Sequence, residues 1–149
     1  MDKKTVSTSS LWTRLLKTDS AERFLRDYDT QEELPPFSEY IQTVCREKGL
    51  VAEHIIKNSG IDRTYGHQLF SGLRKPSRDK VLMLAFGIGL TPDETQDLLR
   101  VAGRSLLYPK IKRDAVIAFC LNKKNSLMET QEILDEMGLT LLGGIEGNG

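Results

Sequence analysis

The sequence has few cysteines, no excess of charge and no long apolar run. Cys45 and Cys120 are far apart and lack CxxC or metal-ligand spacing, which disfavours a disulfide scaffold and predicts a reduced, cytoplasmic setting. The longest apolar run, Val81 to Phe86, has six residues, whereas a membrane-spanning helix needs about 20. No apolar segment typical of a secretory signal follows Met1. We therefore expect no membrane partner.

Charge of either sign is balanced overall but segregated along the chain. The 21 Lys and Arg equal the 21 Asp and Glu, so a protein that is basic over its whole surface is excluded. Residues 38–80, however, carry eight basic and five acidic side chains, and residues 100–113 carry five basic and none acidic. A local basic face therefore remains possible. The 100–113 stretch is either a second contact to a DNA backbone or a partner for the acidic residues after 113.

Sequence motifs typical of catalytic sites are also missing. The two histidines, His54 and His67, do not form HExxH, and neither GxSxG, GxGxxG nor GxxxxGK[ST] occurs. Acidic residues lie mostly on expected exposed faces and near helix starts, where solvation and the helix dipole explain them. We expect no catalytic residues, no metal and no cofactor, and so no enzyme.

Most of the capping and helix-breaking residues in the chain lie where a helix is expected to begin or end. Candidate N-caps precede apolar residues at helical spacing, and glycines follow them. Thr91 with Glu94 and Ser126 with Glu129 form capping boxes. No strand-like alternation bounded by turns occurs, so the predicted architecture is all-α. The expected helices cover about 38–48, 51–58, 63–70, 77–88, 92–102, 110–123 and 127–137, with caps at Ser38, Asp62, Ser77, Thr91 and Ser126.

An internal repeat appears when the sequence is shifted by 35 positions. Ten of the 30 residues from 78 to 107 are identical to the residues 35 positions later, and the capping and terminating positions coincide. This pattern predicts a duplicated helical hairpin, because such repeats stabilise each other by stacking. The second hairpin, 108–142, would turn Ile117, Leu121, Ile133, Leu134 and Met137 inward. It either extends the core of the first hairpin or forms the contact with a second chain.

The two ends of the chain are less informative. Residues 1–37 read as an N-terminal arm with short helices, in which Leu11, Trp12, Leu15 and Leu16 share one face. We expect Trp12 to be a packing anchor. The glycine-rich residues 143–149 are expected to be a disordered tail.

Residues 52–77 carry the most specific pattern. A short helix, a turn at Ser59-Gly60-Ile61 and a second helix with polar side chains lead to Gly72-Leu73-Arg74-Lys75-Pro76-Ser77. Together with Val81 to Leu90, these segments resemble the lambda-repressor-like (Xre-type) regulators over about residues 38–103. The resemblance implies a five-helix helix-turn-helix domain at 38–107, with residues 62–70 as the recognition helix. The hairpin at 108–142 then repeats its last two helices.

The chain departs from the family pattern at three places. The family usually has a small residue at the position of Ile56, where two helices approach closely, and often a branched apolar residue at the position of Gly66. It usually places a glutamine that holds a phosphate near Val51 and Ala52. A glycine inside a helix costs about 1 kcal/mol relative to alanine, so Gly66 is expected to permit a close approach by Tyr65 or by a neighbouring helix.

The recognition helix and the loop after it contain the candidate DNA contacts. Arginine suits guanine, glutamine suits adenine and threonine suits either base or a thymine methyl. The expected base-reading residues are Arg63, Thr64, His67 and Gln68. The expected contacts to the DNA backbone are Tyr65, Arg74, Lys75, Arg78 and Lys80.

The resemblance implies a sequence-specific transcriptional regulator that binds double-stranded DNA as a homodimer on a two-fold site. The alternative is a protein-interaction adaptor built on the same scaffold, because fold alone does not determine function. In either case the N-terminal arm or the C-terminal hairpin is the expected place for a protein partner.

Overall fold

The computed structural model describes residues 8–28 and 34–144, and its regular structure in these ranges is entirely α-helical. The prediction of an all-α protein is confirmed for these residues. The chain divides into two compact units, residues 1–34 and residues 35–149, so the division falls close to the expected end of the arm. Among the described residues, no helix combines the length and apolar character needed to cross a membrane.

The first unit contains the helices α1 (Thr8–Lys17) and α2 (Ala21–Asp27). Phe24 is buried, and its ring centroid lies 5.0 Å from that of Tyr28. Arg14 of α1 donates a hydrogen bond of 2.9 Å to the Tyr28 hydroxyl, which ties the two helices together. The expectation for Trp12 was wrong, because its side chain is 59% exposed while Phe24 supplies the buried contact.

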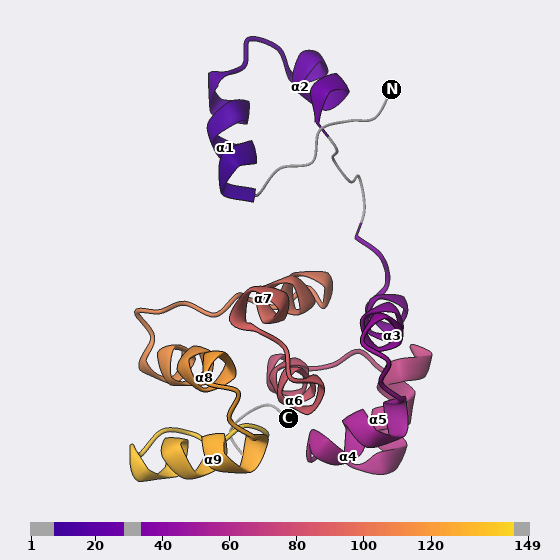
Figure 1. Cartoon of the computed structure of the whole chain (residues 1–149), viewed down its shortest axis with the longest axis vertical. Helices are drawn as coiled ribbons and strands as arrows, with labels where there is room; N and C mark the ends of the chain where they lie inside the picture. Colours follow the sequence, from indigo (N-terminus) through magenta and orange to yellow (C-terminus); the bar gives the residue numbers. More distant parts are fainter. Residues whose placement is uncertain (1–7, 29–33, 145–149) are drawn as a thin grey trace. The chain divides into compact units, whose positions relative to one another are not determined.

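The second unit holds seven helices within its described residues, 35–144: α3 (Phe37–Glu47), α4 (Ala52–Asn58), α5 (Arg63–Ser71), α6 (Arg78–Ile88), α7 (Pro92–Val101), α8 (Lys112–Asn122) and α9 (Leu127–Glu136). Figure 1 shows α6 in the middle, with α3 to α5 on one side and α8 and α9 on the other. Helix α6 is apolar around most of its surface and is almost completely buried, as its position requires.

Local hydrogen bonds explain where these helices begin. The side chains of Asp62, Ser77, Thr91 and Ser126 each accept the backbone N–H three residues later, which confirms these caps. The expected cap at Ser38 was wrong. Helix α3 starts one residue earlier, at Phe37, directly after Pro36. A proline suits a helix start because its fixed φ fits there and its missing N–H would have no helical partner.

The two hairpins, α6–α7 and α8–α9, repeat each other in detail. The Gln96 side chain exchanges two hydrogen bonds with the Leu107 backbone, and Gln131 does the same with Leu142, 35 positions later. Buried residues from Ile41 to Leu142 form one continuous core. The second hairpin therefore extends the core of the first. Ile117, Leu121 and Leu134 are buried as expected, but Met137 is exposed because it follows the last turn of α9.

Reciprocal ion pairs join the hairpins. Arg78 donates two hydrogen bonds to Asp114, at 3.1 and 2.8 Å, and Arg113 donates two to Asp79, at 3.0 Å each. Each arginine thus pairs with the aspartate of the other hairpin. Contacts in which residue i meets j and j meets i are the mark of two-fold symmetry, so the duplicated hairpins are related by a local pseudo-two-fold axis.

The C-terminal end of the repeat is held by the same network. The Gly143 N–H donates to Asp79 at 2.9 Å, just as the Tyr108 N–H, 35 positions earlier, donates to Asp114 at 3.0 Å. The expected disordered tail therefore does not begin at Gly143. The remainder of that expectation, residues 145–149, lies outside the described residues.

Candidate nucleic-acid interface

The candidate interface is built on the pair α4 and α5. Ser59 and Gly60 end α4, and Gly60 has a left-handed φ of +67°, a conformation that glycine adopts without a steric penalty. Ile61 then enters the core and Asp62 caps α5. The residues that the sequence assigned to the turn therefore make the turn.

Close packing between α4 and α5 accounts for two departures from the family pattern. A Cβ atom on Gly66 would lie 2.5 Å from Cγ2 of Ile56 and 2.8 Å from its Cγ1, which is closer than real carbon atoms approach. Ile56 is buried. The large residue on α4 thus occupies the space that a side chain at position 66 would need. The close approach expected at Gly66 is made by α4.

The four expected base-reading residues lie on one face of α5. Arg63 and Thr64 are exposed, and His67 and Gln68, one turn later, are half-buried. The opposite face carries Leu69 and Phe70, which are buried in the core. The expected recognition residues therefore share a polar, solvent-facing surface.

Glu53, which the sequence did not single out, binds two of these residues. Its carboxylate accepts Nε of Arg63 at 2.6 Å and lies 2.6 Å from Nε2 of His67. These hydrogen bonds, that from Arg63 first, lower the pKa of Glu53, and the same contact raises the pKa of Arg63. Glu53 is thus an anion at neutral pH in contact with two of the four expected base-reading residues. The feature of the sequence that could have pointed to Glu53 is its position in the first turn of α4.

Three of the expected backbone-contacting residues form a compact cluster. Arg74 and Lys80 stand over the ring of Tyr65, with the guanidinium carbon 5.6 Å and Nζ 5.7 Å from the ring centroid. Arg74 also donates from Nε to the side-chain oxygen of Gln68 at 2.6 Å. Residues from α5, the following loop and α6 are therefore brought together, and cation–π contacts of this kind are attractive.

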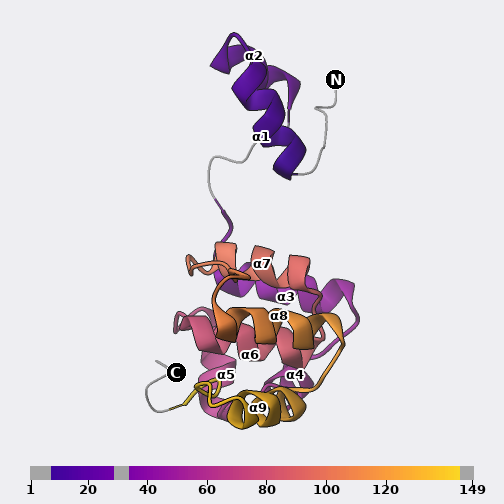
Figure 2. The same ribbon diagram turned by 90° about the vertical axis from the view of Figure 1, so that its left-hand side faces the viewer.

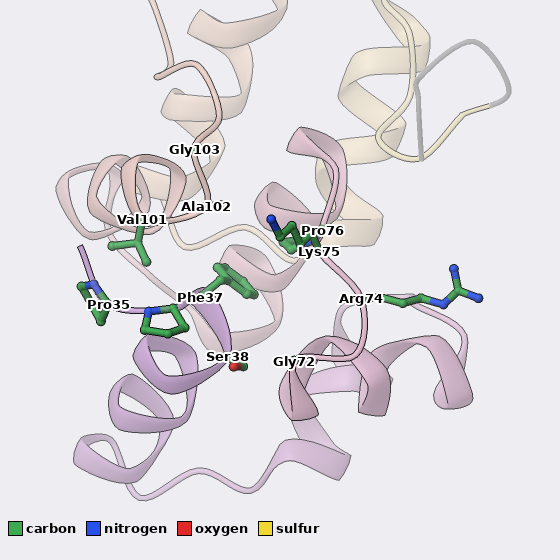
Figure 3. Close-up of a pocket in the computed structure, with 11 residues that line it drawn as sticks. Pro35, Phe37, Ser38, Gly72, Arg74, Lys75, Pro76, Val101, Ala102 and Gly103 are labelled. Atoms are coloured by element: carbon green, nitrogen blue, oxygen red, sulfur yellow. The ribbon is translucent and has the colours of Figure 1, made fainter. Parts of the chain in front are cut away.

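Lys75 borders a hollow of about 370 Å³ at the start of α3. Figure 3 shows the Phe37 ring between the start of α3 and the Lys75-Pro76 segment, while Arg74 extends away from the other lining side chains. The guanidinium of Arg104 donates to the Pro76 carbonyl at 3.0 Å. The loop that presents Arg74 and Lys75 is thus held by the segment that follows α7.

Arg78 does not join this cluster. Its guanidinium contacts the Asp114 carboxylate and also donates to the carbonyls of Ser105 and Leu106 at 2.9 and 3.1 Å. Through these contacts the Arg78 side chain holds the two hairpins together. We therefore leave Arg78 out of the interface, because a phosphate contact would require breaking the pair with Asp114.

The basic residues of 100–113 do not act as one group, either as a surface free to contact a DNA backbone or as a partner for the acidic residues after 113. Arg113 pairs with Asp79 of α6, Arg100 pairs with Asp97 of its own helix, and Arg104 binds the Pro76 carbonyl. Lys110 and Lys112 are exposed. Most of this positive charge is therefore used inside the second unit.

No protein-family model, curated protein or solved structure matches this chain. Within the described ranges, no group of three or more histidine, cysteine, aspartate or glutamate side chains is placed to hold a metal ion.

Proposed function

We propose that this protein is a sequence-specific regulator that binds duplex DNA with a lambda-repressor-like helix-turn-helix, in which α5 is the recognition helix. The observation that carries the proposal is the polar face of α5 flanked by the cluster of Tyr65, Arg74 and Lys80 and by Lys75. A helix with donors and acceptors on its outer face, bordered by cations, combines base reading with phosphate binding.

The residues divide between these two tasks. Arg63, Thr64 and Gln68 offer donors and acceptors to base edges in the major groove. Arg74, Lys75 and Lys80 neutralise phosphates on either side of the groove and fix the position of α5. Tyr65 supports two of these cations rather than touching a base. Two copies of the chain would read the two halves of a two-fold site.

Salt dependence tests the proposal. Three phosphate contacts per protomer predict a log–log slope of about −3 for the association constant against salt concentration, at roughly −0.9 per phosphate. Fluorescence anisotropy of a labelled duplex measures this slope. Binding that is weak and does not change with salt would contradict a role on DNA.

Two substitutions separate base reading from phosphate binding. Gln68→Ala should weaken binding to the preferred sequence by about 1–3 kcal/mol and affect random duplex little. Lys75→Ala should weaken both by a similar factor. The comparison requires the preferred site, which selection from a random duplex pool provides. Equal losses on both DNAs for both variants would mean that α5 does not read bases.

The second candidate is a protein-interaction adaptor on the same scaffold. The observation that favours it is Glu53, because an ionised carboxylate that occupies Arg63 and His67 reduces their attraction for DNA. Retention on heparin and on random duplex distinguishes the two functions. An adaptor should leave both columns at low salt, whereas a DNA-binding regulator should need increasing salt.

A further inference from the structure

The exposed apolar side chains of residues 35–144 are concentrated in the second hairpin and the loop before it. Outside the second hairpin and this loop, the exposed large apolar residues of 35–144 are Val51 and Leu73. The others are Leu106, Tyr108, Ile111, Phe119, Met128 and Met137. An accumulation of exposed apolar side chains on one part of a surface marks an interaction site.

The internal repeat shows how the corresponding surface of the first hairpin is used. Helix α4 packs on α6 so closely that a Cβ atom on Gly87 would lie 2.7 Å from the Ile55 carbonyl oxygen. Leu84, one turn before Gly87, is fully buried. The residues 35 positions later are Asn122 and Phe119, and Phe119 is 55% exposed. Helix α8 is therefore a copy of α6 whose outer face is not covered by another helix of residues 35–144.

The outer face of α8 is apolar and basic. Ile111, Ala115 and Phe119 recur at four-residue spacing on one side of the helix, and the small Ala115 permits a neighbour to approach closely. Lys112 and Lys123 flank this stripe, and Nζ of Lys123 lies 5.8 Å from the centroid of the Phe119 ring. The only acidic residue between 110 and 124, Asp114, is buried with Arg78.

The outer face of α9 has the opposite charge. Its exposed side chains include four acidic residues and Met128, the exposed Met137 follows its last turn, and no lysine or arginine occurs between positions 125 and 144. Figure 2 shows α8 and α9 side by side on the face turned toward the viewer. The four acidic residues are Glu129, Glu132, Asp135 and Glu136.

We propose that a second copy of this chain covers this surface, with the basic α8 of each copy against the acidic α9 of the other around a two-fold axis. A surface with a basic half beside an acidic half is complementary to itself, which is what an isologous dimer requires. An acidic partner of another kind would match α8 and leave α9 facing a like charge. The purpose of the dimer rests on the proposed function, since two copies are needed to read a two-fold site, but the surface is derived from α8 and α9 alone.

Sedimentation velocity of the full chain without DNA tests the dimer. The wild-type protein is expected to be a concentration-dependent dimer, and Phe119→Asp should raise the dissociation constant by about tenfold or more, because buried aromatic residues dominate such interfaces. Leu73→Asp is the matched control, since Leu73 is an exposed leucine outside this surface. Circular dichroism should show unchanged helix content in both variants. A monomeric wild type, or equal dimerisation of Phe119→Asp, would overturn the proposal.

Charge reversal tests the pairing of α8 with α9. Lys112→Glu combined with Lys123→Glu should abolish self-association, and so should Glu132→Lys combined with Glu136→Lys. An equimolar mixture of the two variants should form a heterodimer, because each helix then meets the opposite charge. Failure of the mixture to associate would overturn the proposed pairing. Binding of the monomeric variants to a DNA half-site is measured separately, so that loss of the dimer is distinguished from failure of the proposed function.

Discussion

Among the residues of the candidate interface, Glu53 should affect DNA binding most, because its carboxylate contacts both Arg63 and His67. Its pKa is lowered by these contacts, so it remains charged at neutral pH. We predict that Glu53→Gln binds random duplex several-fold more tightly than the wild type, since the substitution removes a charge that repels phosphate and releases Arg63. Fluorescence anisotropy at fixed salt measures the effect. Glu47→Gln, on α3, removes the same net charge and should have a much smaller effect; equal gains would refute the local role of Glu53.

The close contact between Ile56 and position 66 gives a second prediction at the scale of single residues. Gly66→Val places a side chain where Ile56 lies and should destabilise the protein strongly, and Ile56→Ala should cost about 2–5 kcal/mol through the cavity it leaves. The double variant places a small residue opposite a branched one, the usual arrangement in the family that the sequence resembles. It should be more stable than the sum of the single effects by about 0.5–3 kcal/mol. Urea unfolding of the four proteins measures this coupling, and strict additivity would show that the two residues do not share one space.

At the scale of elements, the crossed arginine–aspartate pairs hold the two hairpins together. Arg113→Ala leaves the Asp79 carboxylate, 3% exposed, without its cation, and Arg78→Ala does the same to Asp114. Each substitution should cost about 3–5 kcal/mol, because an unpaired buried charge is expensive. Arg100→Ala breaks an exposed pair with Asp97 and should cost no more than about 1 kcal/mol. Chemical denaturation compares the three variants, and costs as small as that of Arg100→Ala would contradict the proposed role of the crossed pairs.

The helices from α4 onward, most of the caps and the repeat could be predicted from the sequence because they depend on local spacing. Thr91 and Ser126 lie within four residues of the groups they bind, so the capping pattern is visible along the chain. Arg78 pairs with a residue 36 positions away, and the sequence assigned it to DNA because it lies close to Arg74, Lys75 and Lys80 along the chain. Ile56 and Gly66 stood out individually, but their shared space depends on how two helices pack. Glu53 was missed because an acidic residue in a first helical turn has a simpler local explanation.

At the scale of the whole molecule, one core runs from Ile41 to Leu142 and joins the candidate DNA-binding helices to the duplicated hairpin. This arrangement separates two surfaces of the second unit. The polar face of α5 with its cations is proposed for DNA, and the outer face of α8 and α9 is proposed for a second copy. A protein that needs both a reading surface and a pairing surface gains from a rigid connection between them.

The most direct test of the central claim is an amide ¹H–¹⁵N spectrum of the full chain titrated with duplex DNA. Binding through α5 predicts that the amides of residues 62–75 and of Lys80 shift with increasing DNA, while those along α8 and α9 shift no more than dimer formation alone requires. The same titration with Lys75→Ala should need more DNA to reach the same shifts. Spectra that remain unchanged with duplex DNA, or shifts confined to α8 and α9, would contradict the assignment of α5 as the recognition helix.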